Sequence, residues 1–167
     1  MVHVTALLDA AHSVIRALGD KPSVWWSVLP AHYIAGFMVQ VRAVVGNAQV
    51  VDRRLGESLE ESLMSFERHS QTDDLGRMRF TSLVPKQLAD LVGLAEKSHI
   101  VRQALSGFHR VLVGGQQMDD ELLQRAKALD ISVTRTYGAT ETAGGCVWDG
   151  TPLERTVVEI INGRIAV

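Results

Sequence analysis

The sequence predicts an α/β fold in which helices cover both faces of a doubly wound, mostly parallel sheet of about five strands. The first observation is alternation, because compact β-prone runs and amphipathic helical segments follow one another along most of the chain. The second is spacing, because successive strands are separated by roughly a dozen or more residues, the length that a parallel crossover needs. The third is that the first strand is apolar on both faces, as in a sheet covered by helices.

The first half of the chain alternates helices and strands. We predict a helix at Val4–Leu18, a strand at Ser23–Leu29, a helix that follows Leu29–Gly36 and ends near Val45, a strand at Ala48–Val51 and a helix from about Glu57 to His69. Apolar residues three or four positions apart indicate the helices, and glycine or proline stands at most junctions. The glutamates of the helix predicted from about Glu57 to His69, including Glu61 and Glu67, are expected to form its solvated face. The polar segment Ser70–Gly76 is expected to be a loop.

The second half continues the pattern and then changes. We predict a strand at Arg79–Val84, a helix from Lys86 to about Glu96, a helical piece at Ile100–Leu105, a strand at Arg110–Val113, a helix capped by Asp119 or Asp120 and ending near Leu129, and a strand at Ser132–Thr136. Beyond Gly150, the Asn162-Gly163 pair between two β-prone runs predicts a hairpin with a type I′ turn. Because that hairpin stops after a short second strand, we expect the chain to be a piece cut from a longer protein.

Composition excludes several classes of protein. The net charge of -2 argues against a nucleic-acid-binding face, which needs clustered Lys and Arg. The sequence has no apolar run of roughly 20 residues and no signal-peptide pattern at its start, so we predict no membrane span and a cytoplasmic location. Cys146 is the only cysteine and is expected to be a small buried residue. The histidines lack metal-ligand spacing, and a homo-oligomer is left open.

The segment Val133–Gly150, V-T-R-T-Y-G-A-T-E-T-A-G-G-C-V-W-D-G, is the strongest site signal. A strand runs into a turn that combines polar groups with glycines, whose bare backbone can approach a phosphate or a ring. The residues of interest are Tyr137, Gly138, Thr140, Glu141, Gly144 and Gly145. We expect Tyr137, Thr140 and Glu141 to face one crevice, with Trp148 near enough to wall an aromatic acid. The alternative is a tight strand exit with a solvated glutamate.

A second candidate group follows the first predicted strand. His32 and Tyr33 lie at the carboxyl end of that strand, the edge where open α/β sheets bind ligands. A contact with substrate and simple packing under a loop are both compatible with this position. Cys146 has no neighbouring base in the sequence pattern, so we do not assign it a nucleophilic role.

The motif Y-G-A-T-E-T-A-G-G-C-V-W-D-G-T-P-L resembles the adenylate-forming acyl-CoA synthetases, whose signature is Y-G-x-[ST]-E. Its trailing G-G-C-V-x-D-G-x-P-L is similar to o-succinylbenzoate-CoA ligases of menaquinone biosynthesis. Three other segments are similar to that family in the same order: L-P-A-H-Y-I-A-G, T-S-L-V-P-K-Q-L and V-L-V-G-G-Q-Q-M. The resemblance spans essentially the whole chain.

The resemblance implies an acid-thiol ligase that uses ATP, Mg²⁺ and coenzyme A on a small aromatic carboxylic acid. It implies that Tyr137 lies against adenine, that Thr140 contacts phosphate and that Glu141 binds magnesium. Thr140 and Glu141 are thus the expected catalytic residues. The expected nucleotide-binding residues also include Gly114, Gly115 and Gly138, and the expected substrate-binding residues are His32, Tyr33, Gly36, Gly144 and Gly145. Residues 1–150 would be the acid- and nucleotide-binding subdomain, and residues 151–167 the truncated start of a β subdomain.

The sequence also departs from the family. It lacks a phosphate loop of the T-S-G-S-T-G type, a T-G-D segment and a C-terminal lid with its lysine. Tyr33 stands where many members have a histidine, and His32 precedes it. We therefore expect this chain alone to be an incomplete and inactive part of an o-succinylbenzoate-CoA ligase. The alternatives are a part of another acyl- or aryl-CoA ligase, or a non-catalytic module that binds a nucleotide or a partner protein.

Overall fold

A seven-stranded sheet forms the centre of the molecule. The computed structural model describes residues 2–72 and 76–167. The sheet strands are β1 (Ser23–Ser27), β2 (Gln49–Asp52), β3 (Met78–Leu83), β4 (Arg110–Val113), β5 (Val133–Ala139), β6 (Gly144–Trp148) and β7 (Thr151–Pro152). Their order is β2-β1-β3-β4-β5-β6-β7. The five strands from β2 to β5 pair in parallel, as predicted, whereas β6 and β7 are antiparallel additions at one edge.

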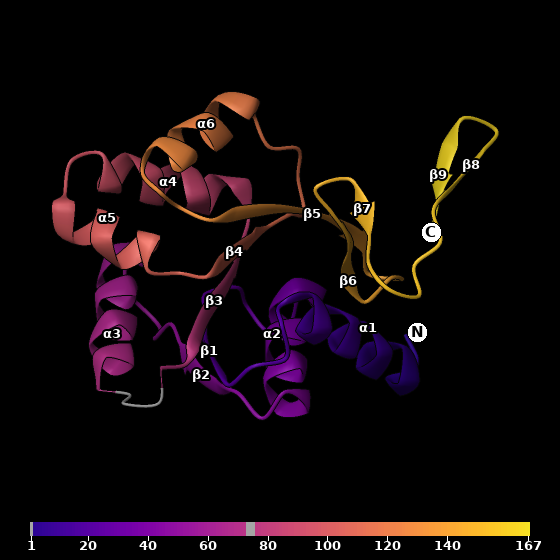
Figure 1. Ribbon diagram of the computed structural model, residues 1–167, viewed down its shortest axis with the longest axis horizontal. Coiled ribbons are helices and arrows are strands. Elements are labelled where there is room, and N and C mark those ends of the chain that lie inside the picture. Colours follow the sequence, from indigo (N-terminus) through magenta and orange to yellow (C-terminus); the bar gives the residue numbers. More distant parts are fainter. Residues whose placement is uncertain (1, 73–75) are drawn as a thin grey trace.

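Helices cover both faces of this sheet (Figure 1). They are α1 (Val4–Ala17), α2 (Ile34–Val45), α3 (Leu59–Gln71), α4 (Pro85–Ala95), α5 (His99–Ser106) and α6 (Asp120–Ala128). Side chains of α3 to α6 pack with one set of strand residues, and side chains of α1 and α2 pack with the other. The prediction of a doubly wound fold is confirmed. Of the loop predicted at 70–76, residues 73–75 lie outside the described residues.

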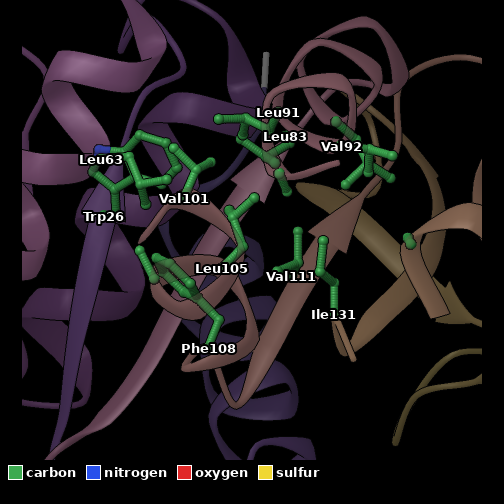
Figure 2. Packing of buried hydrophobic residues seen from close by; sticks show 14 of the residues in the cluster. Trp26, Leu63, Leu83, Leu91, Val92, Val101, Leu105, Phe108, Val111 and Ile131 are labelled. Atoms are coloured by element: carbon green, nitrogen blue, oxygen red, sulfur yellow. The ribbon is translucent and has the colours of Figure 1, made fainter. Parts of the chain in front are cut away.

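Strand β1 shows why the sheet is covered on both sides. All five of its residues are buried. Trp26 packs among Leu63, Phe66 and Phe108 on the α3–α6 face, while Trp25 points to the α1–α2 face and packs on Phe80. Figure 2 shows part of the α3–α6 core, with Trp26, Leu63 and Phe108 labelled. Successive strand residues point to opposite faces, so a strand with no polar face needs helices on both.

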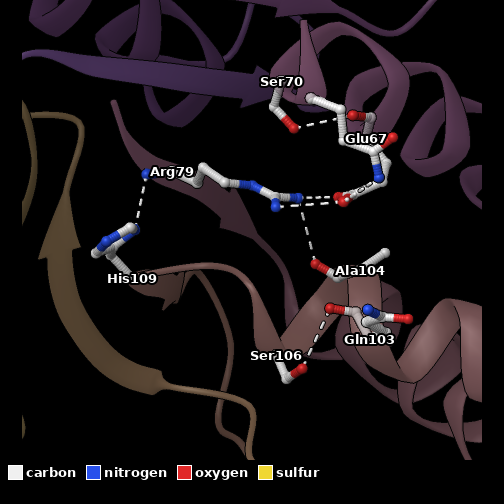
Figure 3. Close-up of polar contacts among 8 residues, drawn as sticks. Glu67, Ser70, Arg79, Gln103, Ala104, Ser106 and His109 are labelled. Atoms are coloured by element: carbon white, nitrogen blue, oxygen red, sulfur yellow. Dashed lines mark hydrogen bonds and ion pairs between the residues drawn. The ribbon is translucent and has the colours of Figure 1, made fainter. Parts of the chain in front are cut away.

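The larger core also buries an ion pair that the sequence did not predict. Glu67 of α3 pairs with Arg79 of β3, and their side chains are 19% and 16% exposed. The Arg79 guanidinium lies 5.3 Å from the ring of Phe66 and 5.2 Å from that of Phe108, and Figure 3 shows it directed at Glu67 and the Ala104 carbonyl. The expectation that Glu67 belongs to a solvated face is therefore wrong. Its partner lies on another element, which helical periodicity does not reveal.

The C-terminal part of the chain contains a separate hairpin. Strands β8 (Glu159–Ile161) and β9 (Arg164–Ala166) pair only with each other and project from the body of the molecule in Figure 1. Asn162 and Gly163 have φ values of 51° and 74°, which is the geometry of the predicted type I′ turn. The sheet itself continues to Pro152 through β7, so the division at residue 150 stays a prediction. No helix in the described part of the chain is long and apolar enough to span a membrane.

Candidate functional site

The main cavity opens at the carboxyl edge of the parallel strands. It has a volume of about 250 Å³. Its walls come from the carboxyl ends of β1, β3, β4 and β5, from both ends of β6, and from α2 on the α1–α2 face. The strand order reverses direction between β1 and β3, and ligands of open α/β sheets bind beside such a switch point. Topology therefore places this cavity where a ligand site is expected.

A second cavity of about 760 Å³ adjoins the first. Gly115, Thr136 and Gly138 line both cavities. Tyr137 lines the second cavity and is 51% exposed, so its ring is available to a flat ligand. Two neighbouring compartments with a shared glycine-rich wall can hold a ligand with two chemically distinct ends.

Glycines form that shared wall because other residues would collide. A Cβ added at Gly114 would lie 2.3 Å from the Thr136 hydroxyl oxygen, and one at Gly138 would lie 1.9 Å from the Gly144 carbonyl oxygen. A Cβ at Gly145 would lie 2.8 Å from the Thr136 Cβ. These glycines are needed for the close packing of β4, β5 and β6, and they also leave backbone exposed to the two cavities.

The turn between β5 and β6 separates the predicted polar residues. Thr140 lines the main cavity, whereas Glu141 lines a third hollow of about 330 Å³ beside α1 and residues 153–157. The turn is held by Thr142, whose hydroxyl accepts from the Ala139 N–H at 2.8 Å and contacts the Gly144 carbonyl oxygen at 2.8 Å. The expectation that Tyr137, Thr140 and Glu141 face one crevice is therefore wrong. A tight β-turn directs successive side chains to different sides.

The predicted residues after β1 are also placed differently. His32 and Tyr33 are exposed and do not line the main cavity, and their rings lie 4.3 Å apart. Ile34 and Ala35 line the cavity instead, because α2 begins at Ile34 and turns its first residues toward the sheet. Gly36 is a packing residue, since a Cβ there would lie 2.3 Å from the Pro30 carbonyl oxygen. The structure does not bring His32, Tyr33 or Gly36 to the cavity.

Arg42 of α2 is the functional candidate that the sequence analysis missed. It lines the main cavity and is 5% exposed. Its guanidinium lies 5.8 Å from the ring of Trp25, and within the described residues it has no ion-pair partner. Burial lowers the pKa of Arg42 to about 10, so the group remains charged at neutral pH. The available sequence signal was spacing, because Arg42 follows the buried residues Met38 and Val39 by four and three positions and so lies on the same face of the helix.

Two further polar groups of this cavity are buried without partners. Ser82 Oγ and Trp148 Nε1 have no hydrogen-bond partner in the described part of the chain, and neither does Arg42 Nε. All three residues line the main cavity. No Asp or Glu lines it, so Arg42 carries the one formal side-chain charge among its described walls. A buried cation and unpaired hydrogen-bonding groups favour an anionic ligand with several acceptor oxygens.

The residues also fit a divalent cation held largely by a ligand. Glu141 is exposed and has no ion-pair or hydrogen-bond partner that the described residues supply. Among these residues no three His, Cys, Asp or Glu side chains gather at one point. Magnesium commonly takes one or two protein carboxylates and completes its shell with phosphate oxygens and water. Glu141 is a single free carboxylate of this kind, and it lines the third hollow.

Comparison with known proteins adds family information to this geometry. The family model described as AMP-binding enzyme matches residues 1–165. A probable 2-succinylbenzoate–CoA ligase of Mycobacterium tuberculosis is 36% identical over 169 residues, which cover 100% of this chain and 42% of the relative. The 2-succinylbenzoate–CoA ligase of Staphylococcus epidermidis is 28% identical over 144 residues, covering 81% of this chain and 26% of the relative. The chain thus spans less than half the length of these relatives.

Solved structures show the same fold. The o-succinylbenzoate-CoA synthetase of Bacillus subtilis in complex with the acyl-adenylate intermediate superimposes with a TM-score of 0.80 at 22% identity, covering 100% of this chain and 34% of that one. The same enzyme in complex with ATP and magnesium ion gives a TM-score of 0.79 at 22% identity, covering 99% of this chain and 35% of that one. Because the family model matches residues 1–165 of the 167-residue chain, the chain belongs to the AMP-binding enzyme family.

Proposed function

We propose that this chain forms the acid- and nucleotide-binding part of a 2-succinylbenzoate–CoA ligase. The observation that carries the proposal is the main cavity, where Arg42 is the one charged lining residue and is buried without a counter-ion among the described residues. A buried unpaired charge is costly, and a bound carboxylate would compensate it. The relatives that are named for this acid support 2-succinylbenzoate as the substrate.

The two adjoining cavities suggest how the substrates divide. The acid occupies the main cavity, with one carboxylate at Arg42 and its reacting carboxylate toward Thr140. The adenosine part of ATP occupies the second cavity against Tyr137 and the Gly115 backbone. Gly138 lies in the wall between them, so the acid oxygen and the α-phosphorus would meet near this residue.

The reaction proposed has two steps. A carboxylate oxygen attacks the α-phosphorus of ATP and pyrophosphate leaves, and the thiol sulfur of coenzyme A then attacks the acyl carbon and AMP leaves. Thr140 would hydrogen-bond a phosphate oxygen, and Glu141 would hold Mg²⁺, which neutralises the charge that develops on the phosphates. Glu141 faces the third hollow in this structure, so its role requires the β5–β6 turn to present it to the nucleotide.

The other properties proposed rest on the similarity to 2-succinylbenzoate–CoA ligases. The pathway is menaquinone biosynthesis, the location is the cytoplasm, and residues 151–167 are the start of a β subdomain. Roles for His32 and Tyr33 in substrate binding have no support from the cavity lining. A homo-oligomer is left open as a separate prediction.

A ligand-titration experiment tests the proposal against its alternatives. We expect 2-succinylbenzoate to raise the melting temperature in proportion to the logarithm of its concentration, because it binds the folded state. At about 100 times the Kd the stabilisation should be about 2.7 kcal/mol. Benzoate and a long-chain fatty acid are the matched controls and should act weakly. Stronger stabilisation by either control would indicate another acyl- or aryl-CoA ligase, and no response to any acid or nucleotide would indicate a non-catalytic module.

A further inference from the structure

Trp148 is buried in an unusual way for a tryptophan. It is 9% exposed, packs with the apolar residues of the α1–α2 face such as Val39 and Leu112, and lines the main cavity. Its Nε1–H can only donate a hydrogen bond. The described residues supply no acceptor for it.

A second tryptophan provides the contrast. Trp26 is fully buried on the α3–α6 face, and its Nε1–H donates to Ser62 Oγ at 3.0 Å. At this structural position, packing therefore gives the buried indole N–H an acceptor. Buried indole N–H groups usually have such a partner. Trp148 differs because, within the described residues, it leaves an unpaired indole donor in a residue that lines the main cavity.

The surroundings of Trp148 define the chemistry of that ligand. Within the described residues, four buried side-chain polar atoms lack partners, and three of them belong to residues that line this one cavity: Arg42, Ser82 and Trp148. A carboxylate has two oxygens and about four acceptor positions, so a single guanidinium does not saturate it. A neutral N–H or O–H group beside the guanidinium can donate to one of the acceptor positions that remain on the carboxylate.

We propose that Trp148 is a specificity-determining residue whose indole N–H donates to the acid carboxylate that Arg42 holds. The inference rests on the proposed function and extends it to a residue of β6. An acid that places an apolar group at this position leaves the N–H unpaired, and a buried unpaired donor discriminates strongly against such a ligand. Trp148 therefore favours diacids over monoacids of the same shape.

The test uses the whole chain, labelled with ¹⁵N at its tryptophan indoles. The probes are 2-succinylbenzoate and 4-oxo-4-phenylbutanoate, which lacks the ring carboxylate. We expect the Trp148 indole proton to move downfield and to exchange more slowly with water when the diacid is added, and to respond little to the monoacid. The Trp26 resonance is the internal control, because its hydrogen bond to Ser62 does not change.

Paired variants give the second measurement. Trp148→Phe should lower the ratio of diacid to monoacid affinity by about tenfold, whereas Trp26→Phe also removes an indole N–H but should leave the ratio unchanged. An unmoved Trp148 resonance, or an unchanged ratio in Trp148→Phe, overturns the inference while the proposed function stands if the diacid still binds. Failure of the wild-type chain to bind the diacid overturns both. If Trp148→Phe does not fold, the wild-type resonance decides the question alone.

Discussion

Arg42 shows how a single residue can be unfavourable for stability and necessary for binding. Its charge is buried beside Trp25, and desolvation is the cause of its lowered pKa. Proteins place such groups at functional sites, where the ligand supplies the missing partner. The sequence pattern did not single out Arg42, because almost every residue of α2 is apolar and no face of the helix stands out as the buried one. In such a helix, an arginine three or four residues from core residues is the signal to look for.

The first prediction concerns replacement of Arg42 by methionine. We expect Arg42→Met to retain or raise the melting temperature, because an apolar side chain of similar length removes a desolvated charge. Binding of 2-succinylbenzoate should weaken by at least about 30-fold, or roughly 2 kcal/mol, as measured by calorimetric titration. Arg102→Met is the matched control, since Arg102 pairs with Asp130 at the surface and should leave binding unchanged. Retained diacid affinity in Arg42→Met would remove the basis of the proposed function.

His109 gives a second prediction, on pH dependence. Burial, then the nearby charges of Arg79 and Lys21, lower the pKa of His109. Its Nδ1 accepts the backbone N–H of Arg79 at 3.0 Å, which requires a neutral ring nitrogen. As the pH falls through about 6.5, the unfolded chain takes up a proton before the folded chain does, so stability decreases.

The measurement is the melting temperature between about pH 7.5 and pH 5.5 for wild type and His109→Asn. Asparagine keeps an acceptor near the Nδ1 position but does not titrate, so the variant should lose less stability on acidification. His12→Asn replaces another exposed histidine, one that accepts no backbone N–H from the described residues, and it is the control. Equal pH profiles for all three proteins would show that His109 is not linked to folding.

At the scale of elements, the parallel strands were easier to predict than the edge of the sheet. Strands β1 and β4 are short, largely apolar and buried runs, and such runs are distinctive in a sequence. Strand β6, G-G-C-V-W, has no counterpart among the predicted strands, and its two glycines are residues that normally weaken a strand. Here the glycines are required, since β5 and β6 approach too closely for side chains at Gly138 and Gly145. The close approach of β5 and β6 is a tertiary constraint, and it overrides the low strand propensity of glycine.

A glycine substitution tests this account of the cavity wall. We expect Gly114→Ala to destabilise the protein by about 1–3 kcal/mol, because the new methyl group would overlap the Thr136 side chain and force β4 and β5 apart. Gly93→Ala is the matched control, since no atom lies within 4 Å of its added Cβ and Gly93 is inside α4. The control should be stabilised by about 0.5–1 kcal/mol. Denaturant unfolding of the two variants gives both values, and equal stability would refute the packing role of Gly114.

At the scale of the whole molecule, the sequence predicted the fold class but only some of the residues that line the site. Alternation and spacing predicted the parallel sheet and its helices but not the strand order, and the glycines and Thr140 of the signature motif do line the cavities. Placement of Glu141, His32 and Tyr33 depended on the direction of turns, which a sequence pattern does not specify. Local patterns predict which edge of the sheet carries a site, but tertiary packing decides which side chains reach it.

The last prediction separates binding from turnover. The two cavities lie within one packed body, so the 167-residue chain should bind 2-succinylbenzoate and show a thermal shift. It should release no pyrophosphate above background, because the phosphate loop, the T-G-D segment and the lysine lid of the family are missing from this sequence. Those parts supply positioning and charge stabilisation in the transition state, which binding alone does not replace. The Mycobacterium tuberculosis relative is the positive control in a coupled pyrophosphate assay, and saturable ATP-dependent release by the 167-residue chain would contradict the prediction.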